Sequence, residues 1–192
     1  NIRKVPRADV IFVSMKAHSL RASLQDAKHL LTPQTYVFLT MNGLGLPEIA
    51  QEFVDADQIV ECVVNYPSKL EGNLVKNDGG NSNIMVRDTT NPPINKLVQS
   101  LFAPDSLDIR IESDFETNQW RKAMMNIGMN GISAISLLKV GEVLERKTLG
   151  AIIKQLIRET LEVAKKEGIE FFSTEKEAVD FFWEFAGKDP DH

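Results

Sequence analysis

One segment of the chain combines an amine and two amides at a spacing that could do chemistry. Lys122, Asn126 and Asn130 stand four residues apart in "QWRKAMMNIGMN" (119–130). At 3.6 residues per turn they share one stripe of a helix, roughly 12 Å long. Amides both donate and accept hydrogen bonds, while lysine donates a proton or pairs with a carboxylate. The stripe predicts either the polar edge of an amphipathic helix or a row of groups that bind a polar ligand.

The composition of the surrounding helix bears on these two interpretations. Trp120, Met124, Ile127 and Ile132 lie elsewhere around the same helix. A helix this apolar is expected to be covered on most sides, and buried polar groups need hydrogen-bond partners. A bound polar ligand would supply such partners, although the polar-edge interpretation stays open at this point.

Two further polar positions follow expected strands. Lys16 closes the apolar run "VIFVSMK", and Asn42 with Gly43 follows "TYVFLT". Ligands of open α/β sheets bind beyond the carboxyl ends of the parallel strands. Taken singly, a lysine after a strand is usually solvated and Asn-Gly is usually only a turn.

The first part of the chain alternates short apolar runs with helical patterns. The expected strands are residues 8–16, 35–40, 58–64, 73–77, 83–87 and 107–113, and the expected helices are 19–31, 46–54 and 91–102. The order β-α-β-α-β at the start predicts a parallel sheet with right-handed crossovers. The sequence "DGGN" (78–81) predicts a hairpin between the strands on either side of it.

From about residue 114 the pattern changes to helices only. Apolar residues recur at helical spacing, Gly168 is a stop signal, and Thr174 is a candidate N-cap of a last helix, 174–186. The sequence therefore predicts an α/β domain over residues 1–113 and an all-helical domain over 114–192.

Composition and charge narrow the class of protein. The 192 residues are 43% hydrophobic and 26% charged, which fits a globular protein with a sizeable core. A net charge of -5 argues against a nucleic-acid surface, although one lysine can still serve an anionic substrate. Because the one cysteine, Cys62, allows no internal disulfide and no apolar run spans a membrane, we expect a cytoplasmic protein without membrane contact.

Three motifs together resemble a known family. "ADVIFVSMKA", "VFLTMNGLG" and "WRKAMMNIGMNGISAI", in this order, are similar to the ketopantoate reductase (2-dehydropantoate 2-reductase) family of the 6-phosphogluconate dehydrogenase-like superfamily. "GEVLE" and "RETLEVAKKEGI" extend the resemblance over nearly the whole chain. The resemblance implies a Rossmann-like, mostly parallel sheet domain that binds NADP(H), followed by a helical domain for substrate binding and dimerisation.

The resemblance also implies roles for the polar residues. Lys122 would be the general acid that protonates the ketone oxygen of a 2-oxoacid as NADPH delivers hydride to its carbon. Asn126 and Asn130 would bind the hydroxyl and carboxylate end of the substrate, and Lys16 and Asn42 would line the cofactor side. No metal is needed, and no histidine has the spacing of a metal ligand.

The chain departs from the family pattern in several places. The phosphate-binding G-x-G-x-x-G turn that follows the family's first strand is absent from this sequence. The segment "NGLGLPE" does not supply it, since Glu48 stands at its third glycine position. Val140 stands where the pantothenate-pathway enzymes tend to have asparagine, and Gly131 where proline is common. We expect most of a longer reductase chain whose first β-α-β unit and last segment lie outside this sequence, because a sheet that starts at its middle strand would leave an edge bare.

Two classes of function therefore remain open. One is an NADPH-dependent reductase of ketopantoate, with a related β-hydroxyacid dehydrogenase as a narrower alternative. The other is a catalytically silent binding or dimerisation module that lacks the phosphate loop. An apolar helical half permits a homodimer without demanding one.

Overall fold

The computed structural model describes residues 6–77, 82–89, 92–102 and 108–187. Within it the chain divides into two compact units, Asn1–Phe115 (unit 1) and Glu116–His192 (unit 2). Each unit has its own apolar core, so each is described separately.

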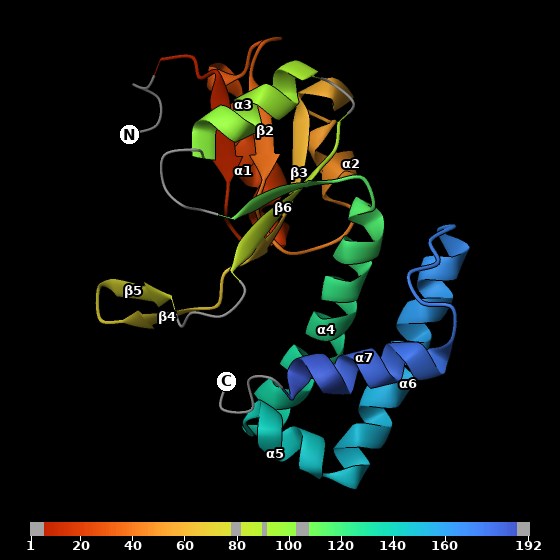
Figure 1. Cartoon of the computed structure of the whole chain (residues 1–192). Helices are drawn as coiled ribbons and strands as arrows, with labels where there is room; N and C mark the ends of the chain where they lie inside the picture. Colours follow the sequence, from red (N-terminus) through yellow and green to blue (C-terminus); the bar gives the residue numbers. More distant parts are fainter. Residues whose placement is uncertain (1–5, 78–81, 90–91, 103–107, 188–192) are drawn as a thin grey trace. The chain divides into compact units, whose positions relative to one another are not determined.

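Unit 1 is built on a five-stranded sheet in the order β1-β2-β3-β6-β7 (Figure 1). The strands are β1 (Val10–Val13), β2 (Tyr36–Leu39), β3 (Ile59–Asn65), β6 (Asn83–Arg87) and β7 (Ile109–Glu112). The first three run parallel, β6 is antiparallel to β3, and β7 is parallel to β6. The prediction of a mostly parallel α/β sheet is confirmed.

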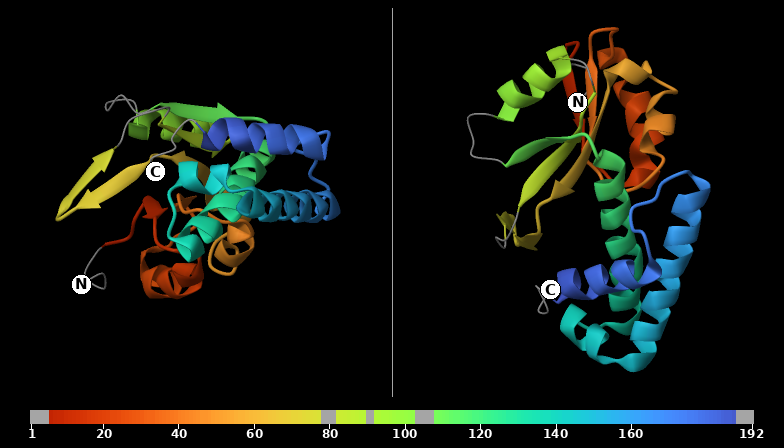
Figure 2. Two further views of the ribbon diagram at one scale, coloured as in Figure 1. Left: turned by 90° about the horizontal axis from the view of Figure 1, so that it is seen from below. Right: turned by 45° about the vertical axis from the view of Figure 1, so that its right-hand side comes forward.

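Helices cover both faces of this sheet. On one face lie α1 (Leu20–Ala27) and α2 (Leu46–Ala50), and on the other lies α3 (Pro92–Phe102), as the right-hand view of Figure 2 shows. Strand β2 serves both faces: Val37 and Leu39 pack with α1 and α2, whereas Phe38 packs with α3. Because side chains of a strand alternate between faces, a strand covered on both sides has no polar position, which explains the continuous run "YVFL".

The predicted hairpin between residues 73–77 and 83–87 is wrong. Strand β5 (Leu74–Asn77) pairs instead with β4 (Ser68–Glu71), as a separate antiparallel two-stranded sheet that projects from unit 1 (Figure 1). The "DGGN" segment that suggested the hairpin lies outside the described residues. The register of β6 is set by β3, where Asn65 Nδ2 donates to Asn83 Oδ1 at 3.0 Å.

Unit 2 is helical and contains most of α4 (Phe115–Ser136), followed by α5 (Val140–Glu145), α6 (Lys147–Lys166) and α7 (Glu175–Ala186). The Thr174 side chain accepts a hydrogen bond from the Glu177 amide and caps α7, as the sequence predicted. The core joins all four helices, and its buried members include Met124, Val143, Ile153 and Phe182. No described helix is long and apolar enough to cross a membrane.

Candidate functional site

Hydrogen bonds connect the carboxyl ends of β1 and β2, just before the loops that carry two of the predicted site residues. The Thr40 amide donates to the Val13 carbonyl at 3.1 Å, and Ser14 Oγ and Thr40 Oγ1 are 2.8 Å apart. The two loops that follow therefore leave the sheet from neighbouring, hydrogen-bonded positions.

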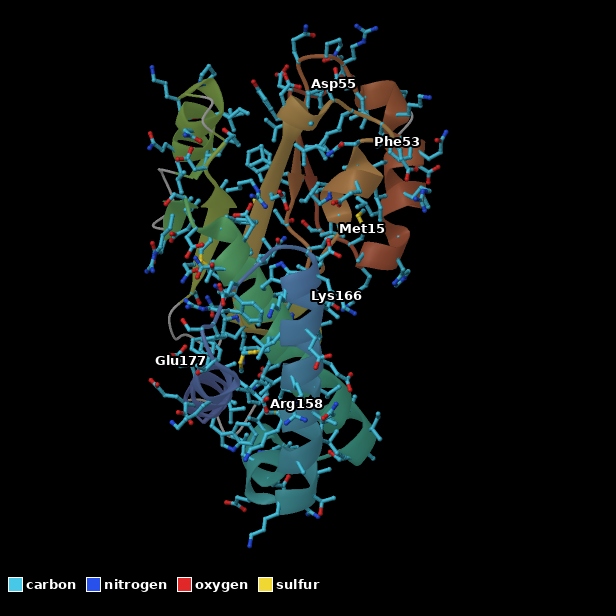
Figure 3. The ribbon with its side chains drawn as sticks, turned by 90° about the vertical axis from the view of Figure 1, so that its right-hand side faces the viewer. Met15, Phe53, Asp55, Arg158, Lys166 and Glu177 are labelled. Atoms are coloured by element: carbon cyan, nitrogen blue, oxygen red, sulfur yellow. The ribbon has the colours of Figure 1, made fainter. Side chains whose placement is uncertain are left out.

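Those loops carry Lys16 and Asn42, and both side chains are exposed. Gly43 has a φ of 139°, and a Cβ placed on it would lie 3.6 Å from the Cβ of Ala17, so the two loops are in van der Waals range. A side chain at this φ would be strained, which explains the glycine after Asn42. Figure 3 shows Met15, in the same loop as Lys16, at the opposite edge of the sheet from Asp55, which precedes β3. The structure thus brings Lys16 and Asn42 to the carboxyl ends of the parallel strands, where ligands of open α/β sheets bind.

The polar stripe of unit 2 lies on α4, as predicted. Asn130 Nδ2 donates to Asn126 Oδ1 at 3.3 Å, which is direct contact between successive turns of the helix. Asn126 is half-buried and Asn130 exposed. Each amide keeps further donors and acceptors beyond this bond, so the pair can still receive a polar ligand.

Lys122 is half-buried one turn before Asn126, and burial lowers the pKa of its amine from 10.5 to about 8. The cause is desolvation, which disfavours the charged form of the amine. The residues one turn away along α4 are uncharged: Asn118, Gln119, Met125 and Asn126. An amine with this pKa is mostly protonated at neutral pH yet gives up its proton far more readily than an ordinary lysine, as a general acid should.

A glycine holds the helix in place, and the sequence analysis missed it. Gly128 lies against α7 so closely that an added Cβ would be 2.5 Å from Phe182 Cε2. The Phe182 ring is fully buried and has little room to retreat. A glycine inside a strongly helical pattern is the signal that could have identified this close approach.

The two departures from the family pattern in unit 2 have different surroundings. Val140 begins α5 and is buried among apolar side chains, so this position offers no polar group to a ligand. Gly131 is exposed, and a Cβ placed on it would meet nothing within 4 Å.

Unit 1 also holds a cavity of about 340 Å³ near the amino end of β3, where Arg87 Nε donates to Glu61 Oε1 at 2.6 Å. None of the predicted site residues lines it. Among the described residues, no three His, Cys, Asp or Glu side chains gather as a metal site would require.

The predicted residues thus form two groups in separate units. In unit 1, the carboxyl ends of β1 and β2 are followed by Lys16 and Asn42. In unit 2, one face of α4 carries Lys122, Asn126 and Asn130. The first group offers exposed donors and acceptors, and the second a readily deprotonated amine beside two amides.

Comparison with protein families gives matches over most of the chain. Residues 2–89 match the family model "Ketopantoate reductase PanE/ApbA", and residues 114–192 match "Ketopantoate reductase PanE/ApbA C terminal".

Curated relatives carry the same name. The 2-dehydropantoate 2-reductase of Streptococcus pyogenes serotype M1 is 28% identical over 165 residues, which are 85% of this chain and 54% of that protein. The enzyme of the same name from Caulobacter vibrioides is 25% identical over 162 residues, 83% of this chain and 53% of that one. The chain therefore spans about half the length of the curated relatives it matches.

Solved structures share the fold. A dimeric ketopantoate reductase from Staphylococcus aureus superposes with a TM-score of 0.82 at 23% identity, over 100% of this chain and 63% of that one. A ternary structure of D-mandelate dehydrogenase with NADH and anilino(oxo)acetate gives a TM-score of 0.86 at 23% identity, also over 100% and 63%. At this identity the likeness shows a common fold.

Proposed function

Because this chain belongs to the ketopantoate reductase PanE/ApbA family, we propose that the protein reduces the ketone of a 2-oxoacid, ketopantoate (2-dehydropantoate) in particular, with a nicotinamide cofactor. Residues 1–113 would serve the cofactor, NADP(H) in this proposal, and residues 114–192 the substrate. The product of ketopantoate reduction is pantoate.

The observation that carries the proposal is the environment of Lys122. Reduction of a ketone creates an alkoxide, which a nearby ammonium group stabilises before it supplies the proton. Burial brings the pKa of Lys122 to about 8, so the amine holds its proton at neutral pH and releases it at modest cost. General acid catalysis of this kind is worth about 10²- to 10⁴-fold in rate.

The two amides would orient the substrate. Asn126 lies one turn beyond Lys122 on the same stripe, and Asn130 donates a hydrogen bond to Asn126. Amide N–H groups suit the carboxylate of a 2-oxoacid, and amide oxygens suit a hydroxyl. Four residues of helix rise about 6 Å, and this spacing matches a small acid that extends along the helix from its ketone.

In this proposal, the carboxyl ends of β1 and β2 in unit 1 would line one part of a dinucleotide site. Lys16 and Asn42 are exposed there on touching loops, and a lysine can pair with a phosphate while an amide can bind a ribose hydroxyl. When bound, the nicotinamide supplies the hydride. Every proton step in this proposal belongs to Lys122.

A second candidate is reduction of another 2- or 3-oxoacid by the same groups. Val140 favours it, because this side chain is buried and apolar where the resemblance implies an asparagine in the pantothenate-pathway enzymes. Such a substrate would depend less on hydrogen bonds at that position than ketopantoate does.

A substrate panel tests the proposal and separates the two candidates. We expect purified protein to oxidise NADPH with ketopantoate at a higher kcat/KM than with pyruvate, 2-oxoisovalerate or benzoylformate. A preference for one of the other acids would support the second candidate. The protein used must be folded by circular dichroism and must have the mass of a full-length reductase. If such a protein oxidises neither NADPH nor NADH with any of these acids, the proposal is overturned.

A further inference from the structure

A row of aromatic rings connects α4 to the last two elements of unit 2. Adjacent ring centroids in this aromatic row are 6.0, 5.3, 5.2 and 5.9 Å apart. The row runs from Trp120 on α4 through Phe171 and Phe172, in the connection between α6 and α7, to Phe181 and Phe185 on α7. Centroid separations of this size are typical of attractive edge and offset contacts.

Arg121 lies over the middle of the aromatic row. Its guanidinium carbon is 4.9 Å from the centroid of the Phe172 ring and 5.7 Å from that of Phe181. The Nε atom is buried and has no hydrogen-bond partner among the described residues. Within the described part of the chain, this side chain contacts ring faces as a cation, and such contacts depend on close placement.

These contacts fix the rotation of one turn of α4. Successive residues of a helix point about 100° apart around its axis. Trp120 and Arg121 therefore point in two different directions, and each contacts a different residue of the same short connection, Phe171 and Phe172. Two contacts in different directions oppose rotation of this turn, so they help to hold the direction in which the next residue, Lys122, leaves the helix.

Charged groups of the neighbouring segments are spread on the surface. The connection and the first half of α7 carry the following charged residues, all exposed: Glu167, Glu170, Glu175, Lys176, Glu177 and Asp180. Glu175 is paired with Arg158, and Lys176 with Asp180. Burial lowers the pKa of Lys122, so that pKa depends on how the lysine side chain is oriented on α4.

We propose that Arg121 is a positioning residue for Lys122: by stacking on Phe172 and Phe181, it locks the α4 turn that keeps the lysine amine half-buried. The effect on the amine concerns unit 2 alone. The effect on turnover rests on the function proposed above, in which Lys122 is the proton donor.

Two substitutions separate positioning from mere stability. Arg121→Met keeps the length and apolar stem but removes the cation, and Arg121→Lys keeps the cation but loses the planar group that covers two rings. In reduction, the rate falls at high pH as the general acid loses its proton. We expect this descending limb to move from about pH 8 toward 10.5 in Arg121→Met, and kcat at pH 7 to fall at least about 10-fold, with the KM for NADPH unchanged. Arg121→Lys should lie between the wild type and Arg121→Met.

A matched control removes a similar contact elsewhere in the unit. The Lys154 amine is 5.7 Å from the centroid of the Trp183 ring, between α6 and α7. Lys154→Met should lower the melting temperature to a similar extent and leave the descending limb at about pH 8.

A titration of the unliganded protein makes the inference independent of catalysis. The Lys122 side-chain ¹³Cε signal, assigned with Lys122→Met, should titrate near 8 in the wild type and at higher pH in both Arg121 variants. If the wild type titrates so but reduces no 2-oxoacid, the proposed function fails and the positioning role stands. An unchanged titration and an unchanged descending limb in folded Arg121→Lys would overturn the positioning role, whether or not Arg121→Met folds.

Discussion

Replacement of Lys122 by methionine should make the protein more stable while it removes the proposed proton donor. The amine is half-buried, and desolvation penalises its charged form in the folded state. Methionine has a similar length and no charge, so it fills the same space without that penalty. Residues that serve a reaction often lower stability in this way.

The size of the effect follows from the pKa. A change from 10.5 to about 8 corresponds to about 3 kcal/mol of free energy of unfolding, at about 1.4 kcal/mol per pH unit. This value is an upper bound, because the group is only half-buried and solvent screens its charge. The variant also loses the polar contacts of the amine, so we expect a net gain of roughly 1–2 kcal/mol at pH 7.

The sign of the pH dependence provides the sharper test. Between pH 8 and 10.5 the unfolded lysine still holds its proton while the folded one has lost it, so the unfolded state binds more protons. The wild type therefore gains stability as pH rises through this window. The advantage of Lys122→Met should be complete below pH 8 and disappear toward 10.5.

Urea unfolding of both proteins at pH 7, 8, 9 and 10, followed by circular dichroism, measures this difference. Lys16→Met, at an exposed position, is the control that removes a lysine without relieving burial. A difference between wild type and Lys122→Met that stays constant from pH 7 to 10, or a variant that is less stable at every pH, would refute the reasoning.

Three further outcomes follow from packing and burial. Gly128→Ala should destabilise the protein by about 1–2 kcal/mol in thermal unfolding, because overpacking against Phe182 outweighs the higher helix propensity of alanine. Gly131→Ala has open space around it and should stabilise the protein by up to about 1 kcal/mol. Equal effects of the two substitutions would contradict the close contact at Gly128. Gln58→Ala should lower the urea midpoint by an amount equivalent to about 2–3 kcal/mol, since the buried amide donates to the carbonyls of Thr32 and Thr35, both at 2.7 Å. A change below about 0.5 kcal/mol, the size expected of a surface substitution, would contradict this prediction. Burial raises the pKa of the Cys62 thiol to about 12, so a disulfide reagent at pH 8 should modify it only in urea; rapid modification of the native protein would show that the thiol is accessible.

Much of the architecture was accessible from the sequence because apolar patterns report burial. The run "YVFL" is covered on both faces, so its continuous apolar pattern predicts a strand without any tertiary information. The four-residue spacing from Lys122 to Asn130 likewise required only helical geometry to predict a shared stripe, and the Asn126–Asn130 hydrogen bond lies on it.

Other features depend on contacts that the local sequence does not encode. Strand β4 was missed because all four of its residues are exposed, so no alternation of polar and apolar residues marks it. The β5 strand was found, but its partner was misassigned, since a strand pattern says nothing about which strand it pairs with. The close approach of Gly128 to Phe182 and the stacking of Arg121 join residues some 50 positions apart and arise only in the packed unit.

In the function that we propose, Lys122 donates the proton in reduction of a 2-oxoacid. Steady-state oxidation of NADPH with ketopantoate by wild type and Lys122→Ala, together with NADPH binding by fluorescence, tests it most directly. We predict that kcat falls by about 10²- to 10⁴-fold in Lys122→Ala while the Kd for NADPH stays within about twofold. Turnover at the wild-type rate in a folded Lys122→Ala protein would contradict the account.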